Sequence, residues 1–300
     1  MVADRVVEST EIKTGTAASG DVVFTKYDRR SLTYANSFDS PLQSTVIRSI
    51  EWLTGKITII KLIREFERSG APSGQPFWRA ALDVMGIPLT TPQEQIDRIP
   101  AEGPVVVVAN HPHGMVDGMI LADLIGRRRP DYKILTRAIL TGIDEVAASF
   151  MIPAPFPHDP EAQAKFKTMR ADAMDLLKNG GVVSLFPSGV VANSKTMFGP
   201  AEEAEWNVFT AQLIRRSGAR VLPIFFPGGN SRWYQMANRF SATLRQGLLL
   251  HEIVHSCNKP QSPVVGQPLD DAQMELLHKD PRGFMVWLRE HTLALGAHAK

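Results

Sequence analysis

A run of four valines at residues 105–108 constrains the fold of this 300-residue chain more than any other feature. A continuous run of β-branched residues is typical of a strand that is buried on both faces of a parallel sheet. Similar apolar runs follow at residues 182–186 and 221–226. Segments with helical periodicity separate the three runs, so the sequence predicts an α/β fold in which helices cover a mostly parallel sheet.

The remaining elements of this fold are predicted from spacing and from chain breakers. We expect a helix from Asp117 to about Ile125, a short strand at 133–135, a helix within 138–149, a helix marked by Phe166, Met169, Ala173 and Leu176 and closed by Gly180 and Gly181, and a helix marked by Trp206, Phe209, Leu213 and Ile214. A central strand rarely tolerates proline, so Pro223 predicts either the start of a strand or an edge strand.

The N-terminal part of the chain has a different character. Residues 1–40 are polar and predict a loosely ordered arm, residues 41–90 predict N-terminal helices, and residues 91–300 predict the α/β domain. One helical face within residues 42–67 is apolar, and basic residues flank it; the two sets are Val46, Ile50, Leu53, Ile57 and Ile60, and Arg48, Lys56, Lys61 and Arg64. Such a helix either enters the headgroup layer of a membrane or packs on its own domain. Gly55 weakens its middle, and residues 77–85 predict a second short helix.

Charge and composition narrow the functional classes. The net charge of +2 gives no overall basic field, so we expect no nucleic-acid partner. The single cysteine, Cys257, allows no disulfide within the chain and fits a reducing compartment. We find no signal peptide in the first 40 residues and no run of 18 apolar residues. The expected location is therefore cytoplasmic, with contact to the inner face of a membrane from its surface.

The segment with the most chemistry is the loop after the first buried strand, residues 110–118. It holds His111, His113 and Asp117 among prolines and glycines that keep the path rigid. A histidine that is oriented by a carboxylate can act as general base toward a hydroxyl, so His111 with Asp117 is the candidate pair and His113 a possible second histidine. Two alternatives remain: the three side chains could bind a metal, although no further ligand falls at a typical spacing, or His111 could be structural.

Two later segments also follow buried strands. The first, residues 185–189, includes Phe186, Pro187, Ser188 and Gly189, where a hydroxyl and backbone N–H groups could bind an oxyanion. It is not a nucleophile elbow, because Phe186 stands where glycine is required. Lys195 could reach an anionic headgroup or lie solvated at the surface. The second, residues 221–231, holds Gly228 and Gly229, which would allow close approach of backbone to a ligand, or form a plain loop.

Together these segments resemble the glycerolipid acyltransferases related to 1-acylglycerol-3-phosphate acyltransferase, most of all the bacterial hemolysin-like lysophospholipid acyltransferase branch. Asn110 and His111, five residues and then Asp117 resemble the first family motif, residues 186–189 the third and residues 221–223 the fourth. Residues 248–252 and 264–268 look like the closing strand. The resemblance covers about residues 75–270. Residues 111–114 also look like a motif of small diacylglycerol acyltransferases.

The resemblance implies catalysis by His111 with Asp117, an oxyanion or acceptor site at Gly114, Ser188 and Gly189, and a substrate pocket near Phe186, Pro187 and Pro223. It implies no metal and no cofactor besides the acyl donor, which is acyl-CoA or acyl carrier protein. The acceptor would be a lysolipid, such as a lysophospholipid or a lyso-ornithine lipid. The third motif departs from the family, since Ser188, Val190 and Val191 replace its charged residues. A thioesterase that uses the same pair, or an inactive lipid-binding protein, are the alternatives.

Overall fold

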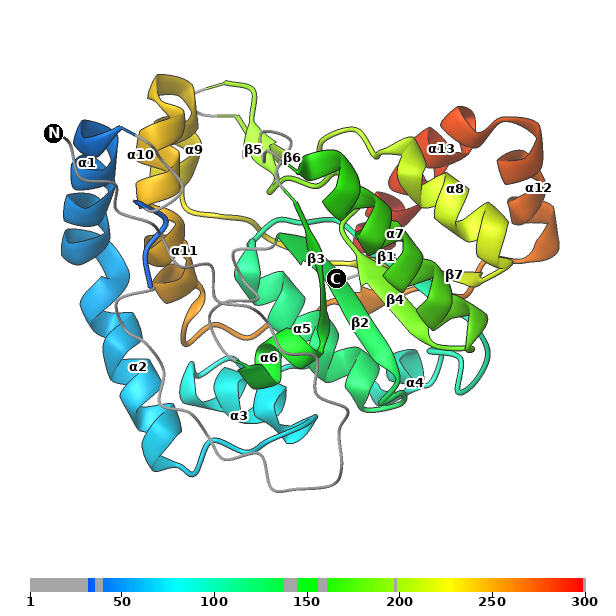
Figure 1. Cartoon of the computed structure of the whole chain (residues 1–300), viewed down its shortest axis with the longest axis horizontal. Helices are drawn as coiled ribbons and strands as arrows, with labels where there is room; N and C mark the ends of the chain where they lie inside the picture. The colour runs from blue at the N-terminus through cyan, green and yellow to red at the C-terminus, as the bar shows by residue number, and fades with distance from the viewer. Residues whose placement is uncertain (1–31, 36–39, 138–144, 156–160, 197–198, 299–300) are drawn as a thin grey trace, which may run out of the picture.

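The valine run forms β1 (Val105–Ala109), which pairs in parallel with β4 (Val182–Leu185) on one side and with β7 (Arg220–Phe225) on the other. In this computed structural model, residues 32–35, 40–137, 145–155, 161–196 and 199–298 are described. The main sheet has six strands in the order β3-β2-β4-β1-β7-β8, and only β8 runs antiparallel; β2 spans Tyr132–Arg137, β3 Met151–Ala154 and β8 Val264–Val265. Figure 1 shows β3, β2, β4, β1 and β7 side by side. The predicted α/β fold with a mostly parallel sheet is confirmed.

Alternate valines of β1 face opposite layers of the molecule. Val105 and Val107 pack in one apolar cluster with α2 (Ile57–Arg68), α3 (Pro76–Val84) and α5 (Met115–Gly126). Val106 and Val108 pack in the other, with three helices that cover the opposite face: α7 (Ala162–Lys178), α8 (Val208–Ser217) and α13 (Pro281–Ala294). Both faces of the strand are closed to solvent, which explains why its sequence is continuously apolar rather than alternating.

The other strands and helices of the described chain are shorter. They are α4 (Gln93–Ile96), β2 (Tyr132–Arg137), α6 (Glu145–Ser149), β3 (Met151–Ala154), β5 (Asn193–Ser194), β6 (Ala201–Glu202), α9 (Arg232–Phe240), α10 (Ala242–Gly247), α11 (Leu249–Ser256), β8 (Val264–Val265), α12 (Asp271–Lys279) and a final 3₁₀ turn (Leu295–His298). β5 and β6 pair as a separate antiparallel ribbon. None of the helices in these ranges is both long and apolar enough to span a membrane.

Several expectations need correction. The helix predicted from Asp117 begins earlier, at Met115, so Asp117 lies in the first turn of α5. Residues 248–252 do not form a strand, because Leu249–Ser256 is helical, with one face packed in the apolar cluster; only 264–265 is extended. Pro223 lies inside β7, neither at its start nor at an edge of the sheet.

Pro223 is tolerated there because of the short partner strand. Its carbonyl accepts a hydrogen bond from Gly266 N–H at 2.9 Å, so its ring nitrogen faces the same side, where β8 has only two residues. The helix expected within 138–149 is present at Glu145–Ser149, and the first part of that range lies outside the described residues. Most of the expected arm, residues 1–31 and 36–39, also lies outside them.

The N-terminal helical segment is confirmed as a nearly continuous rod. It consists of α1 (Pro41–Glu51), a π-helical turn (Trp52–Lys56) and α2. Gly55 lies where the rod touches α11, since an added Cβ would meet the carbonyl carbon of Leu250 at 2.8 Å. The sequence suggested only that Gly55 weakens the helix. In the structure, Gly55 allows the backbone of the rod and that of α11 to come into close contact.

The rod has two apolar stripes. Ile47, Ile59 and Phe66 face inward and are buried. A second stripe, here called the outer stripe, faces solvent and consists of Leu42, Val46, Trp52, Leu53 and Ile57. Packing on the domain therefore explains only one of the two apolar faces, and three residues of the face predicted from sequence belong to the outer stripe.

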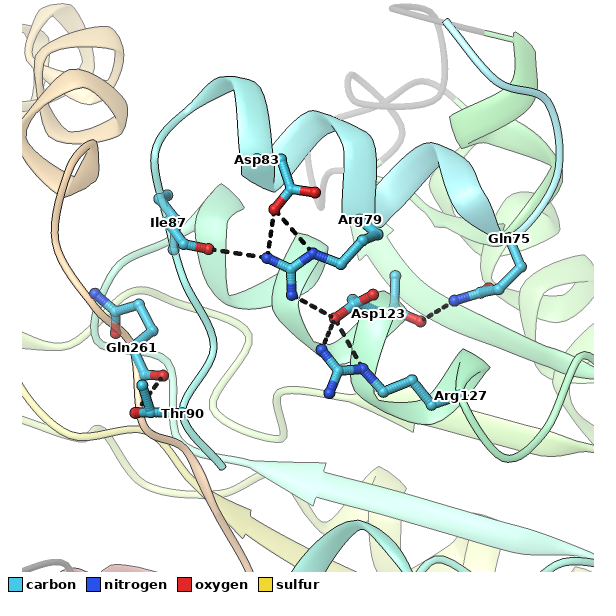
Figure 2. A network of polar contacts seen from close by, with 9 residues as sticks. Gln75, Arg79, Asp83, Ile87, Thr90, Asp123, Arg127 and Gln261 are labelled. Atoms are coloured by element: carbon cyan, nitrogen blue, oxygen red, sulfur yellow. Dashed lines mark hydrogen bonds and ion pairs between the residues drawn. The ribbon is translucent and has the colours of Figure 1, made fainter. Parts of the chain in front are cut away.

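A polar network fastens the N-terminal helices to α5, which carries Asp117 (Figure 2). Gln75 donates to the carbonyl oxygen of Ala122 at 3.0 Å. The buried carboxylate of Asp123 pairs with Arg127 at 2.6 Å and with Arg79 at 3.6 Å. These contacts join α3 to α5.

Candidate active site

The site begins where β1 ends. Asn110 follows the strand and pairs twice with the backbone of Phe226 beyond β7: its Nδ2 donates to the carbonyl at 2.9 Å, and its Oδ1 accepts from the N–H at 2.7 Å. This pairing holds the carboxyl ends of β1 and β7 together, the edge where ligands gather on such sheets. Asn110 therefore positions the loop that carries both histidines, a role that its sequence alone did not indicate.

Asp117 is the centre of the site. Its Oδ2 lies 3.0 Å from Nδ1 of His111 and accepts from the backbone N–H of His113 at 2.8 Å. Its Oδ1 lies 2.9 Å from Nδ1 of His113. Gly114, with a positive φ of 74°, makes the sharp turn between the histidines and the helix. One buried carboxylate therefore orients both imidazoles.

The charge state of Asp117 follows from its surroundings. Burial alone would raise the pKa of this carboxyl, but hydrogen bonds and charge interactions with His111 and His113 outweigh it and hold the pKa below its usual range. An ionised carboxylate only accepts hydrogen bonds, so both Nδ1 atoms carry protons. With Nδ1 carrying a proton, Nε2 is the ring nitrogen that can accept one.

The two histidines differ in what they face. The side chain of His111 is 16% exposed and lines a cavity of about 440 Å³. Its ring stacks on Phe186, with centroids 3.8 Å apart and an angle of 18° between the planes. His113 is 7% exposed and does not line that cavity; a Cβ added to Gly228 would lie 3.0 Å from its Nε2. Of the two imidazole rings, only that of His111 lies in the wall of the cavity, where a substrate could reach it.

The cavity is mainly apolar and suits a hydrocarbon chain. Its walls come from α2, α3, β2, α5, α10 and α11, and include Ile59, Ile63, Phe66, Phe77, Met119, Leu250 and Ile253. Leu32, Thr33 and Tyr34 also line it. The buried carboxylate of Glu51 holds this short segment, because it accepts from the hydroxyl of Thr33 at 2.6 Å and from Tyr34 N–H at 2.7 Å.

The loop of His111 is anchored from a distant part of the chain. Glu203, which is buried, accepts from His111 N–H at 3.0 Å and from the indole N–H of Trp206 at 3.0 Å. Arg289 donates to the carbonyl oxygen of Glu203. Ala192 N–H donates to the carbonyl of His111 at 2.8 Å. Sequence patterns gave no signal for Glu203, because 92 residues separate it from the loop it holds.

Glu203→Gln tests this anchor. Glutamine can accept only one of the two N–H groups and turns a donor toward the other, so we expect the free energy of unfolding to fall by about 1–3 kcal/mol and turnover to fall with it. Urea denaturation and an activity assay measure both. The adjacent Glu202, half-exposed and paired with Lys195 at 2.6 Å, is the matched control, and Glu202→Gln should change stability by less than about 0.5 kcal/mol. Equal effects of the two variants would contradict the anchor.

The other predicted residues are placed as follows. Gly114, Phe186 and Gly189 line the cavity, whereas Ser188, Pro187 and Pro223 do not. Ser188 Oγ donates to the carbonyl of Val190 at 3.0 Å, and Gly189 N–H donates to that of Phe186 at 2.9 Å, so both belong to a turn. Pro223 packs in the sheet near Gly266.

Two further residues behave as parts of the scaffold or surface. Lys195 is largely exposed and pairs with Glu202, as expected of a surface lysine. Cys257 is half-buried, and burial raises the pKa of its thiol, which disfavours the reactive thiolate. In the part of the chain that the structure describes, no group of three His, Cys, Asp or Glu residues is arranged to hold a metal ion.

The fold and site are those of an α/β protein with a His–Asp pair at the carboxyl end of its sheet, beside an apolar cavity. Residues 92–227, which include the pair, match the model of the Acyltransferase family. This stretch covers 136 of the 300 residues; through it the chain is similar to this family, and the match supports an acyltransferase enzyme. The family implies an acyl donor and a lipid acceptor as substrates.

Among solved structures, the chain is similar to the 1-acyl-sn-glycerophosphate (LPA) acyltransferase, PlsC, from Thermotoga maritima, with 14% sequence identity over 74% of this chain and 78% of the other and a TM-score of 0.49. No curated protein matches the chain significantly.

Proposed function

We propose that this acyltransferase moves a fatty acyl group from a thioester, acyl-CoA or acyl carrier protein, to the hydroxyl of a lysolipid, with His111 as general base. The observation that carries the proposal is the position of His111: its Nδ1 is held by a buried carboxylate, and its ring forms part of the wall of an apolar cavity. A general base must reach the hydroxyl proton while the acyl chain is kept out of water, and this position serves both needs.

The proposed reaction is direct transfer. Nε2 of His111 takes the proton of the acceptor hydroxyl, and the oxygen forms a bond to the thioester carbonyl carbon. The carbon–sulfur bond then breaks, and the imidazolium returns its proton to the leaving thiolate. Asp117 holds the ring and stabilises the imidazolium. Neither a covalent enzyme intermediate nor a metal is required, and Ser188 is not a nucleophile.

The transient oxyanion needs hydrogen-bond donors. Gly114 and Met115 line the cavity at the start of α5, where the first N–H groups of a helix have no partner within the helix. These groups are the proposed donors. Gly189 was the other candidate from sequence, but its N–H already donates to Phe186, which favours the α5 end.

A transfer assay with the purified protein tests this function. Labelled acyl-CoA and acyl-acyl carrier protein are each offered with a panel of lysolipids, including lysophospholipids and a lyso-ornithine lipid. Product that requires both donor and acceptor is expected. Release of free fatty acid at the same rate without any acceptor would identify a thioesterase instead, and binding of lipid without turnover would leave an inactive binding protein.

The protein is further proposed to meet the inner face of the membrane through the outer stripe. Leu53 is 86% exposed and Trp52 58% exposed, and Lys56, Lys61 and Arg64 lie on the same rod. On α9, Trp233 and Phe240 are also exposed, and α10 packs between α9 and α1 (Figure 1). Exposed apolar side chains beside basic ones favour a surface with anionic lipids.

Leu53→Glu tests this surface. Burial of a leucine contributes about 1.5–3 kcal/mol, so its loss should weaken binding to anionic vesicles about 10-fold or more. Vesicle flotation measures the bound fraction. Val286→Glu is the matched control, because Val286 is 59% exposed on α13, outside the N-terminal rod. Undiminished flotation of Leu53→Glu would remove the outer stripe from the proposal.

A further inference from the structure

A second hollow, here called the polar recess, lies beside the site, between the start of β6 and the loop that joins β7 to α9. It has a volume of about 490 Å³, and its walls include Gly228, Gly229, Asn230, Arg232 and Gln235. None of the residues that line it is acidic. Unlike the cavity at His111, it offers amides, a guanidinium and glycine backbone, beside the small apolar surfaces of Pro200 and Ala201.

Two amides in these walls lack partners. Gln235 is 6% exposed; its Oε1 accepts from Ser194 N–H at 2.7 Å, which fixes the orientation of the amide, and its Nε2 has no partner in the described part of the chain. The side-chain oxygen and nitrogen of Asn230 are both shielded from solvent and also have no partner there. Buried polar groups without partners are rare in native proteins, and each one needs an explanation.

Further donors face the same region. The N–H groups of Gly228 and Gly229 make no hydrogen bond within the described ranges, and Gly228 has a positive φ of 88°. Successive unpaired N–H groups in such a turn form an anion-binding concavity. The exposed Arg232 makes no ion pair with any described residue, so its charge is available at the rim.

The loop is held rigidly against the catalytic residues. Ser231 donates through N–H and through Oγ to the buried carboxylate of Glu252, both at 2.6 Å. Gly228 borders the ring of His113, which in turn bonds Asp117. A ligand group in the polar recess would therefore lie near His113, which contacts Asp117 of the proposed His111–Asp117 pair.

From these features we infer that the polar recess binds a phosphate group of a substrate, with Gln235 and Asn230 as hydrogen-bond donors and Arg232 as counter-charge. The inference rests on the proposed function for its biological meaning, since the phosphate belongs either to the headgroup of the acceptor or to the donor. The polar recess has an excess of hydrogen-bond donors, one cationic side chain and no carboxylate among its lining residues. These features favour an oxyanion over a cation or a hydrocarbon.

The test is direct binding of small phosphates by isothermal titration calorimetry, which does not depend on turnover. Glycerol 3-phosphate represents the acceptor headgroup, and adenosine 3′,5′-bisphosphate represents the phosphates of coenzyme A. Gln235→Glu keeps an oxygen for Ser194 N–H and replaces the free donor with a negative oxygen, so affinity should fall about 10- to 100-fold. Arg232→Gln, a change on the surface, gives a second variant that leaves the buried packing intact.

The control is Arg216→Gln, which removes an exposed arginine from α8, away from the polar recess. Loss of glycerol 3-phosphate binding in both recess variants would assign the phosphate to the acceptor, and loss of bisphosphate binding would assign it to the donor. In the same variants, the KM of the substrate that carries this phosphate should rise. If the wild type binds phosphate but transfers no acyl group, and the recess variants lose that binding, the inference stands and the proposed function is rejected. No binding by the wild type, or binding that both variants retain, would overturn the inference.

Discussion

Replacing His111 with alanine is expected to lower the turnover of acyl transfer by about 10²- to 10⁴-fold while the protein stays folded and still binds lipid. Asp117 orients two imidazoles, and only that of His111 lines the apolar cavity; the variant removes it. Initial rates with labelled acyl donor and a saturating acceptor measure the effect, and binding of the acyl donor is followed separately.

Two histidine variants sharpen this result. His113→Ala removes an imidazole that shares Asp117 but does not line the cavity, so its turnover should fall less than that of His111→Ala. His278→Ala changes an exposed histidine on α12 and should leave the rate unaltered. A His113→Ala variant as inactive as His111→Ala would mean that both rings act in catalysis, and normal turnover in His111→Ala would exclude it as the base.

Replacing Asp117 with asparagine is expected to reduce both turnover and stability. Aspartate accepts three N–H groups here, from two rings and one backbone amide, whereas asparagine has one accepting oxygen. Buried donors are left without partners, so the free energy of unfolding should fall by about 3–5 kcal/mol. His111 also loses the tautomer that makes Nε2 basic, so turnover should fall even at temperatures where the variant is folded.

The pH dependence of this effect has a definite sign. The folded-state pKa of Asp117 lies below that of the unfolded chain, so its stabilisation is fully present above about pH 4, the ordinary value for aspartate, and is lost as the pH falls through the lower folded value. Urea denaturation from pH 7 to pH 3 should show a constant difference between wild type and variant down to about pH 4, and a shrinking one below it. A difference that grows on acidification would contradict the lowered pKa.

Asp123→Asn is the matched control for Asp117→Asn. Asp123 is a second buried carboxylate on α5, but its partners are Arg79 and Arg127 and it lies outside the site (Figure 2). Its loss should destabilise the fold without a comparable loss of turnover by the folded fraction. Equal losses of turnover would indicate that Asp117 acts only by holding α5 in place.

The sequence predicted well those features that depend on neighbours along the chain. The valine run predicted β1, and the strand-to-loop boundary predicted where His111 and Asp117 would lie. Residues 248–252 were assigned to a strand from resemblance alone, and the prediction failed because they pack as a helix against the N-terminal rod, at Gly55. Pro223 was misplaced because the rule for proline depends on how long the partner strand is.

The features of the site also fall into two groups: those that the sequence predicted and those that only the tertiary structure decided. The spacing of His111, His113 and Asp117 determined that a carboxylate could orient an imidazole, since all three are held in one short turn and the helix that follows it. Which histidine faces the cavity was decided by the tertiary structure, because Phe186 and the N-terminal rod come from distant segments. The same holds for the Glu203 anchor and for the polar recess. Local sequence fixes which groups can pair within a turn, whereas burial and long-range hydrogen bonds exist only once β1, β4 and β7 bring their loops to one edge of the sheet.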